Sequence, residues 1–567
     1  MSTATSDLPP FEVPRLQRAA FPERVRLICL TWASQVAPNP PIVMALYWAK
    51  YLFVYVGGWA VFVAFDAGYP GVMSPLSWAF TATAFQKAIA WSILYELLGL
   101  GCSWGPMNAR FKPMIGGFRY FLRPGTTKLP LFPGVPLIGA YRRSWLDAAV
   151  YLVNALCLVR ALVAPEVTPG LLLPSLILIP VMGVLDKTLF LAARAEHYWV
   201  ALSCLVLASG DGLWISGCKL LWCFIWFWAA TSKLNEHFPS VIQFMMNNGP
   251  FLPKAVKQRL FASYPSDLRP SRLARLMSRI GTATEYSLPF LLTLSPNETT
   301  TVLFLCLMVS FHGFISLNNP SGMPIEWNIL MIYGGIFLFG VQRAVPIAAL
   351  TGAPLLLAFL LFCLFVVPCF GNFFPARVSF LLSMRYYAGN WAYNVWLVRK
   401  SALAKLNRLV KPAGTMREQL AAMGLDADAV DMGTMLSLAH RFMHFEGRPL
   451  LEALPRAVDR IDDYEWMDGE VIGGAIIGWN FGDGHLNGKL LLDAIQPQCE
   501  FAPGELRVVS IESSPLFAST MAWQIFDAAS GRVDQGVTDL SAMRNETPWP
   551  SGRYAAALEV DGFRQRA

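Results

Sequence analysis

Charged residues are scarce in this chain. Of its 567 residues only 15% are Asp, Glu, Lys or Arg, whereas 55% are hydrophobic and 13% are Phe, Trp or Tyr. Soluble globular domains carry about 25% charged residues. The composition therefore excludes an ordinary soluble protein and predicts a polytopic membrane protein in contact with lipid.

Cysteine patterns of the structural or metal-binding type are also missing. The ten cysteines contain no Cys-x-x-Cys pair, and most of them lie inside or beside apolar runs. Cysteines in such positions behave as small buried hydrophobic residues. We therefore expect neither a disulfide framework nor a metal site.

A nucleic-acid surface is not indicated either, although the formal net charge is +7. Lys and Arg residues gather in loops beside apolar runs, as the positive-inside rule expects of cytoplasmic loops. Four arginines (Arg15, Arg18, Arg24 and Arg26) precede the first long apolar run, which is unlike a cleavable signal peptide. We expect residues 1–42 to form a cytoplasmic arm, with an interfacial helix around Phe21 to Gln35.

Apolar runs predict about ten transmembrane helices in a membrane core over residues 43–370. They are Met44–Phe65, Trp78–Gly99, Leu146–Val163, Leu171–Val184, a run that contains His197 and ends near Ser209, Leu213–Thr231, Ala283–Leu294, Thr300–Leu317, Ile325–Phe339 and Pro354–Val367. Ten crossings put both termini and each strongly basic loop on one side. We predict a multi-pass protein of the cell (inner) membrane with its C-terminal domain in the cytoplasm.

The chain changes character after the last apolar run. Residues 371–400 are aromatic and predict an interfacial linker, and residues 401–567 have the composition of a soluble α+β domain. Helical patterns cover Leu403–Leu409, Met416–Met423 and Asp431–Phe445. Strand-like patterns cover Val471–Trp479, Leu506–Glu512 and Thr520–Phe526.

The stretch from Leu185 to His237 concentrates ionisable residues at the ends of two apolar runs. His197 opens the first run and Lys233 closes the second, so an antiparallel helix pair would bring both to one membrane face. Leu-Asp-Lys-Thr at 185–188, the following His197 and Ala-Thr-Ser-Lys-Leu at 230–234 resemble the membrane core of vitamin K-dependent gamma-glutamyl carboxylase and its bacterial relatives, the horizontally transferred transmembrane (HTTM) proteins. Asp186 and Lys187 predict a structural ion pair or a helix cap.

Lys233 has two interpretations. A lysine at a helix end is most often an interfacial anchor that extends its ammonium group to the membrane surface. A lysine held in an apolar pocket can instead act as a base. The resemblance implies the second role, because the matching lysine of the carboxylases deprotonates vitamin K hydroquinone.

The resemblance also implies roles for two histidines. It includes a functional histidine at His197, and relatives carry an aromatic-His pair like Phe311-His312 in a late helix. Tyr198, Trp199 and Glu285 are the expected contacts to the cofactor, which would be a reduced quinone of the menaquinol or vitamin K hydroquinone type. Glu285 is also a candidate partner for Lys233 or His312, and a purely structural salt bridge there is an equal alternative. His440 and His444 are four residues apart but lack the glutamate of a zinc-protease motif.

Two classes of function follow. The first is a quinone- and oxygen-dependent, carboxylase-like membrane enzyme with Lys233, His197 and His312 at its centre. The second is a non-catalytic membrane scaffold or lipid-handling protein that has this fold alone, since a fold does not determine a function.

Overall fold

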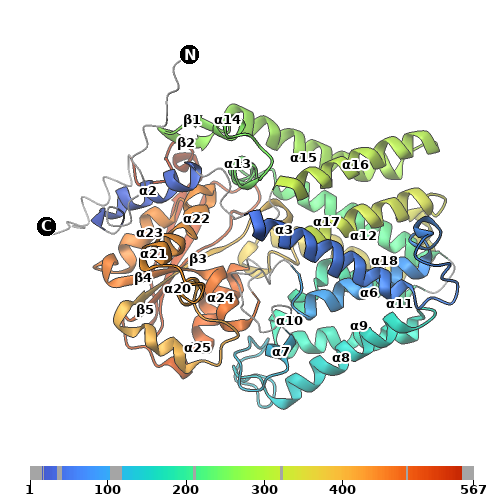
Figure 1. Ribbon diagram of the computed structural model, residues 1–567, viewed down its shortest axis with the longest axis horizontal. Coiled ribbons are helices and arrows are strands. Elements are labelled where there is room, and N and C mark those ends of the chain that lie inside the picture. The colour runs from blue at the N-terminus through green and yellow to red at the C-terminus, as the bar shows by residue number, and fades with distance from the viewer. Residues whose placement is uncertain are drawn as a thin grey trace.

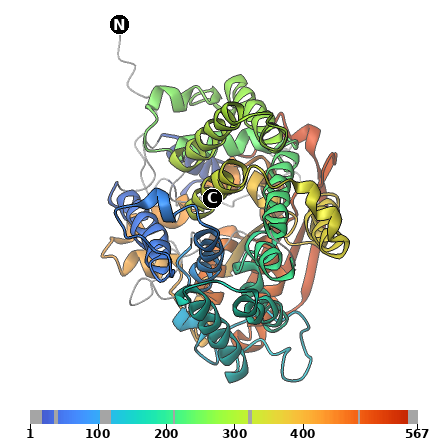
Figure 2. The ribbon, with the colours of Figure 1, turned by 90° about the vertical axis from the view of Figure 1, so that its right-hand side faces the viewer.

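A computed structural model describes residues 16, 18–34, 41–101, 118–208, 212–318, 324–479 and 483–551. Long helices form one half of the molecule, at the right of Figure 1, and a sheet covered by short helices forms the other half. Figure 2 looks at the molecule from the helical end, so that most of the long helices are seen along their axes. Three residues named in the predictions from the sequence lie outside the described residues: Arg15, Gln35 and Ser209.

A helix occupies each of the ten predicted runs. The helical segments are α3 (Pro41–Ala49) continued by η1 (Lys50–Val56) and α4 (Gly57–Val63), α6 (Ala82–Leu97), α8 (Trp145–Val163), α9 (Pro169–Leu185), η3 (Ala195–Trp199) continued by α11 (Val200–Leu207), α12 (Leu213–Ser232), α15 (Arg272–Thr293), α16 (Glu298–Asn318), α17 (Ile325–Gly335) continued by η4 (Ile336–Val341), and α18 (Pro354–Leu361) continued by η6 (Phe362–Val366) and α19 (Val367–Phe373). Within the described residues, five helical stretches are long and apolar enough to cross a membrane: Ala45–Val63, Trp145–Val163, Leu213–Ser232, Glu298–Asn318 and Pro354–Phe373. The number of crossings stays a prediction.

Local capping explains where several of these helices begin. Ser144 and Asp147 form a reciprocal capping box at the start of α8. Asp186 caps α10 (Lys187–Ala192) by accepting a hydrogen bond from the main-chain N–H of Thr188 at 3.1 Å. The predicted helix cap at Asp186 is confirmed, and its ion-pair partner is Arg143 at 2.5 Å.

The segment before α15 contains two helices and a hairpin. Helices α13 (Phe238–Asn248) and α14 (Lys254–Gln258) are followed by a two-stranded antiparallel hairpin, β1 (Phe261–Ser263) and β2 (Asp267–Pro270). Helix α15 starts at Arg272, eleven residues before the predicted apolar run, because Ser271 caps it there.

The second half of the molecule is built on a five-stranded antiparallel sheet of order β4-β3-β5-β6-β7. Its strands are β3 (Tyr393–Arg399), β4 (Tyr464–Asp468), β5 (Leu506–Ile511), β6 (Thr520–Asp527) and β7 (Gly531–Asp539). Strand β3 pairs with β4 on one side and with β5 on the other. The sheet therefore begins inside the segment predicted to be a linker.

Short helices surround the sheet. They are η9 (Lys400–Arg408), α20 (Met416–Ala421), α21 (Ala427–Leu436), α22 (Ala439–Met443), η10 (Phe445–Gly447), α23 (Leu450–Ala457), α24 (Gly469–Ile477), η12 (Leu486–Leu490), α25 (Leu491–Cys499) and α26 (Leu540–Met543). The predicted strand at Val471–Trp479 is wrong, because these residues form most of α24. The carboxylate of Asp468 caps that helix by accepting from the N–H groups of Glu470 and Val471.

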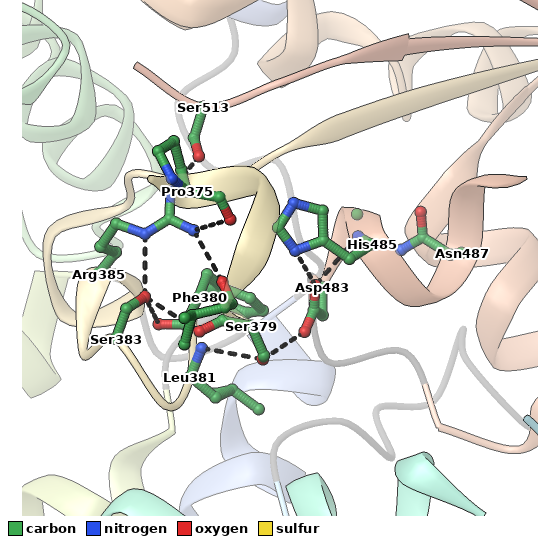
Figure 3. A network of polar contacts seen from close by, with 12 residues as sticks. Pro375, Ser379, Phe380, Leu381, Ser383, Arg385, Asp483, His485, Asn487 and Ser513 are labelled. Carbon is green, nitrogen blue, oxygen red and sulfur yellow. Dashed lines mark hydrogen bonds and ion pairs between the residues drawn. The ribbon is translucent and has the colours of Figure 1, made fainter. Parts of the chain in front are cut away.

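The N-terminal helix and the linker join the two halves. Helix α2 (Phe21–Ser34) confirms the helix predicted near Phe21, and its apolar face packs in the same core as α22 and α23 (Figure 1). In the linker, the fully buried guanidinium of Arg385 donates to Ser383 Oγ at 2.9 Å and to Ser513 Oγ (Figure 3). Arg385 thus ties residues after the last membrane helix to the end of β5.

Candidate ligand cavity

A cavity of about 640 Å³ lies where the helical bundle meets the C-terminal half of the molecule. Its walls come from helices α12, α13, α15, α16 and α17, from residues 386–391 and from α22, His444 and Glu470. Most of the lining is apolar, with few polar groups. This combination is typical of a site for a small, largely apolar molecule.

Lys233 and Glu285 form an ion pair in the cavity wall. Lys233 follows the last residue of α12, and Glu285 lies in the middle of α15. Their exposed fractions are only 6% and 4%, and the ammonium nitrogen of Lys233 lies 5.1 Å from the ring centre of Phe238. Lys233 therefore points into the protein, which does not match a lysine that reaches out to the membrane surface.

His312 lies in the same wall with both ring nitrogens hydrogen-bonded. Trp226 Nε1 donates to His312 Nε2 at 3.0 Å, and His312 Nδ1 lies 2.9 Å from Asn328 Oδ1. An indole N–H can only donate, so Nε2 is the acceptor and Nδ1 carries the proton. His312 is consequently a neutral imidazole that positions its neighbours.

His197, Tyr198 and Trp199 are not among the described residues that line the cavity. They lie in η3, which begins directly after Arg194, whose φ of 51° interrupts the chain between α10 and η3. The ring of His197 meets the edge of Trp222 at 5.2 Å, one helical turn before Trp226 on α12. The two predicted histidines thus contact tryptophans on successive turns of α12, and only His312 lies in the cavity wall.

A buried polar cluster lies behind this wall, and its central residue is Arg194. The guanidinium of Arg194 lies 3.1 Å from the ring centre of Trp327, pairs with Glu196 and donates to Tyr387 Oη at 2.5 Å. Trp327 and Tyr387 also line the cavity. These two aromatic residues therefore separate the cavity from the cluster and contact both.

Two glutamates complete the cluster. Trp327 Nε1 donates to Glu96 Oε1 at 2.9 Å, and the side chain of Glu326, the residue before Trp327, lies close enough to Glu96 to interact with it electrostatically. Their exposed fractions are 2% and 0%. Two carboxylate charges in one buried site repel each other, so this arrangement favours a proton on one of the two groups.

The opposite end of the cavity is formed by His440, His444 and Glu470. His440, Asp468 and Glu470 have potential ligand atoms within 4.8 Å of one another, which could suggest a cation site. However, Arg441 bonds Asp468 at 2.5 Å and Glu470 at 2.8 Å. A metal ion would have to displace this arginine, so the arrangement favours a salt-bridge network.

The histidines at this end are neutral. Burial, reinforced by the positive charge of Arg441, lowers the pKa of His440 to about 3. Burial also holds the pKa of His444 well below its ordinary value, and His237 and Arg441 add to the effect. Both imidazoles therefore offer one N–H donor and one acceptor nitrogen near pH 7.

The sequence pointed to Lys233 through the resemblance, and to His312 because an imidazole inside an apolar run is costly unless it is bonded. The structure brings both residues into the cavity wall together with Glu285. Sequence reasoning missed Arg194, Trp327 and Tyr387. The signal for Arg194 was its charge beside Glu196 and His197, but no pattern along the chain connects it with Trp327.

Comparisons with known proteins identify the family. A family model described as a transmembrane protein of unknown function (DUF3556) matches residues 1–558. The chain belongs to this family. No curated protein and no solved structure matches it. As a member of DUF3556, it is an integral membrane protein in contact with lipid, and its mostly helical structure with several apolar helices agrees with that assignment.

Proposed function

We propose that this DUF3556 protein binds a reduced quinone in the cavity and removes a proton from it, as the first step of a carboxylase-like, oxygen-dependent reaction. The observation that carries the proposal is the buried Lys233–Glu285 pair in an otherwise largely apolar cavity. Such a cavity suits a ring with an isoprenoid tail. The Lys233–Glu285 pair offers a polar contact for a ring hydroxyl.

The pair can act as a base because burial disfavours separated charges. Transfer of the Lys233 proton to Glu285 converts the ion pair into a free amine and a carboxylic acid. The amine then accepts the proton of the quinol hydroxyl and leaves a quinol anion, which molecular oxygen can oxidise. Lys233 becomes an ammonium group again and stabilises that anion by its charge.

The resemblance of residues 185–188, His197 and 230–234 to the HTTM and carboxylase proteins supports the same role for Lys233. His312 would position the wall through Trp226 and Asn328. His197 would act from outside the wall, since its Nδ1 lies 3.5 Å from the hydroxyl of the lining residue Tyr387.

A second candidate is a non-catalytic lipid-handling protein. The mostly apolar cavity lining favours it, because an acyl chain would fit the same walls. In this case the Lys233–Glu285 pair would bind a lipid head group and no turnover would occur.

Oxygen uptake by the purified protein with menaquinol or vitamin K hydroquinone tests the proposal. Lys233→Arg and Lys233→Ala should abolish uptake, because a guanidinium does not release its proton at accessible pH. Lys219→Arg is the matched control, since Lys219 lies in the same helix and binds main-chain oxygens of Gln342 and Val345 outside the cavity. Normal uptake by Lys233→Arg would exclude Lys233 as the base, and no uptake by the wild type would favour lipid handling.

A further inference from the structure

His444 holds an unused hydrogen-bond donor at the domain end of the cavity. The main-chain N–H of Glu446 donates to His444 Nδ1 at 3.2 Å and caps η10. An imidazole nitrogen that accepts a hydrogen bond carries no proton. In the neutral ring the proton must therefore be on Nε2.

Nε2 of His444 has no hydrogen-bond partner among the described residues. The side chain is only 5% exposed and forms part of the cavity wall. Leaving a buried N–H donor without a partner costs free energy. This cost would be recovered if a molecule in the cavity supplied an acceptor.

The ring of His444 is held firmly in this position. It stacks on Trp391 with ring centres 6.0 Å apart, on His237 at 5.7 Å, and meets the edge of Tyr393 at 5.3 Å. The donor is thus fixed in direction before a ligand arrives, which lowers the entropy cost of binding.

We propose that His444 Nε2–H recognises a neutral acceptor oxygen, of the ketone, quinone or phenol type, on the head group of the cavity ligand. This inference rests on the proposed function and adds a second polar contact to the Lys233–Glu285 pair. A neutral acceptor fits better than a phosphate, because a neutral imidazole brings no charge and the neighbouring Arg441 is already paired with Asp468 and Glu470. The ligand class is therefore an apolar molecule with an uncharged oxygen at its ring.

Two substitutions separate the two ring nitrogens. His444→Asn keeps an acceptor near the position of Nδ1 for the N–H of Glu446 and removes the Nε2 donor. His444→Gln places an amide N–H near the position of Nε2. The hydrogen bond from the Glu446 N–H, which caps η10, distinguishes the two variants. Because His444→Asn keeps the acceptor of this bond, its thermal unfolding should show the same stability as the wild type.

The probe is menadione, a naphthoquinone without a tail, and the readout is quenching of the fluorescence of Trp226, Trp327 and Trp391, which line the cavity. A neutral hydrogen bond contributes about 1 kcal/mol, so His444→Asn should weaken binding about fivefold and His444→Gln should restore most of it. If His444→Asn binds menadione as the wild type does, or if both variants lose binding and stability together, the inference is wrong. If the wild type does not bind menadione, the proposed quinone function fails first.

Discussion

The indole N–H of Trp226 donates a hydrogen bond to Nε2 of His312 over 3.0 Å inside the cavity wall. This contact joins α12 to α16 and leaves the imidazole proton on Nδ1, where it bonds to Asn328. His312, which stood out in the sequence as part of an aromatic-His pair in a late helix, is thus the neutral centre of a three-residue contact.

The first prediction follows from that contact. Trp226→Phe should leave His312 Nε2 without a donor and destabilise the protein by about 1–3 kcal/mol. The chain has six histidines, so nitrogen chemical shifts of labelled protein can be assigned with a His312→Gln variant. The wild type should show the Nδ1–H form at His312, and a charged imidazolium near pH 7 would contradict this interpretation.

A second prediction concerns the Lys233–Glu285 pair. Lys233→Met or Glu285→Gln alone should destabilise the protein by about 3–5 kcal/mol, because each leaves a buried group without its partner. The double variant should lose less than the sum of the two, since no isolated charge remains. Thermal unfolding in detergent measures the cycle, and additive losses would show that the two groups do not interact.

The third prediction is that Glu96 and Glu326 share a proton. Infrared spectra of the protein at neutral pH should contain a carbonyl band of a protonated carboxylic acid that shifts in Glu96→Gln and in Glu326→Gln. Glu23→Gln is the control, because Glu23 lies on the partly exposed face of α2 near Arg26. An unchanged band in both Glu96→Gln and Glu326→Gln would place the proton elsewhere.

A fourth prediction uses His485, which pairs with Asp483 (Figure 3) and also with Glu512. Burial lowers the pKa of His485, but the charges of Glu512 and Asp483 outweigh it, so this pKa is raised above 6.5. The stabilisation that protonated His485 gives to the folded protein is therefore fully present below pH 6.5. It is lost as the pH rises through the pKa of His485 in the folded state.

Glu512 behaves in the opposite way. Burial raises its pKa, yet the contacts with His485 outweigh burial and lower it to about 2, so its contribution is present above pH 4.5 and lost as pH falls toward 2. Midpoint temperatures of thermal unfolding, measured from pH 4 to 9, should be highest between about pH 4.5 and pH 6.5. His485→Gln should remove the decline above pH 6.5, and an unchanged decline would assign it to other groups.

The fifth prediction concerns sidedness. The basic loops predict that the C-terminal domain faces the cytoplasm and that the loop after α4, which contains Gly71, faces the opposite side. A periplasmic reporter inserted after Gly71 should be active, and the same reporter at the C-terminus should be inactive. The reverse result would invert the orientation of the whole chain.

Much of the membrane half could be predicted from the sequence, because helix formation in an apolar run depends on the run itself. All backbone hydrogen bonds of a membrane helix are made within a few residues, so composition and length suffice to place α8, α12 and α16. An imidazole in such a run is costly unless it is bonded, and this cost identified His312, whereas Lys233 was identified by the resemblance.

The sequence by itself determined that the chain is a membrane protein and where the helices of its apolar runs lie. The tertiary structure alone decided the partners. Arg194 stacks on Trp327 from 133 positions away in the chain, and β3 pairs with β4 and β5 although it looks like an aromatic linker. Contacts of this kind depend on how distant surfaces fit together. Residues Val471–Trp479 show the limit of local patterns. Their apolar residues suit a strand, but the cap at Asp468 and burial on the sheet select a helix.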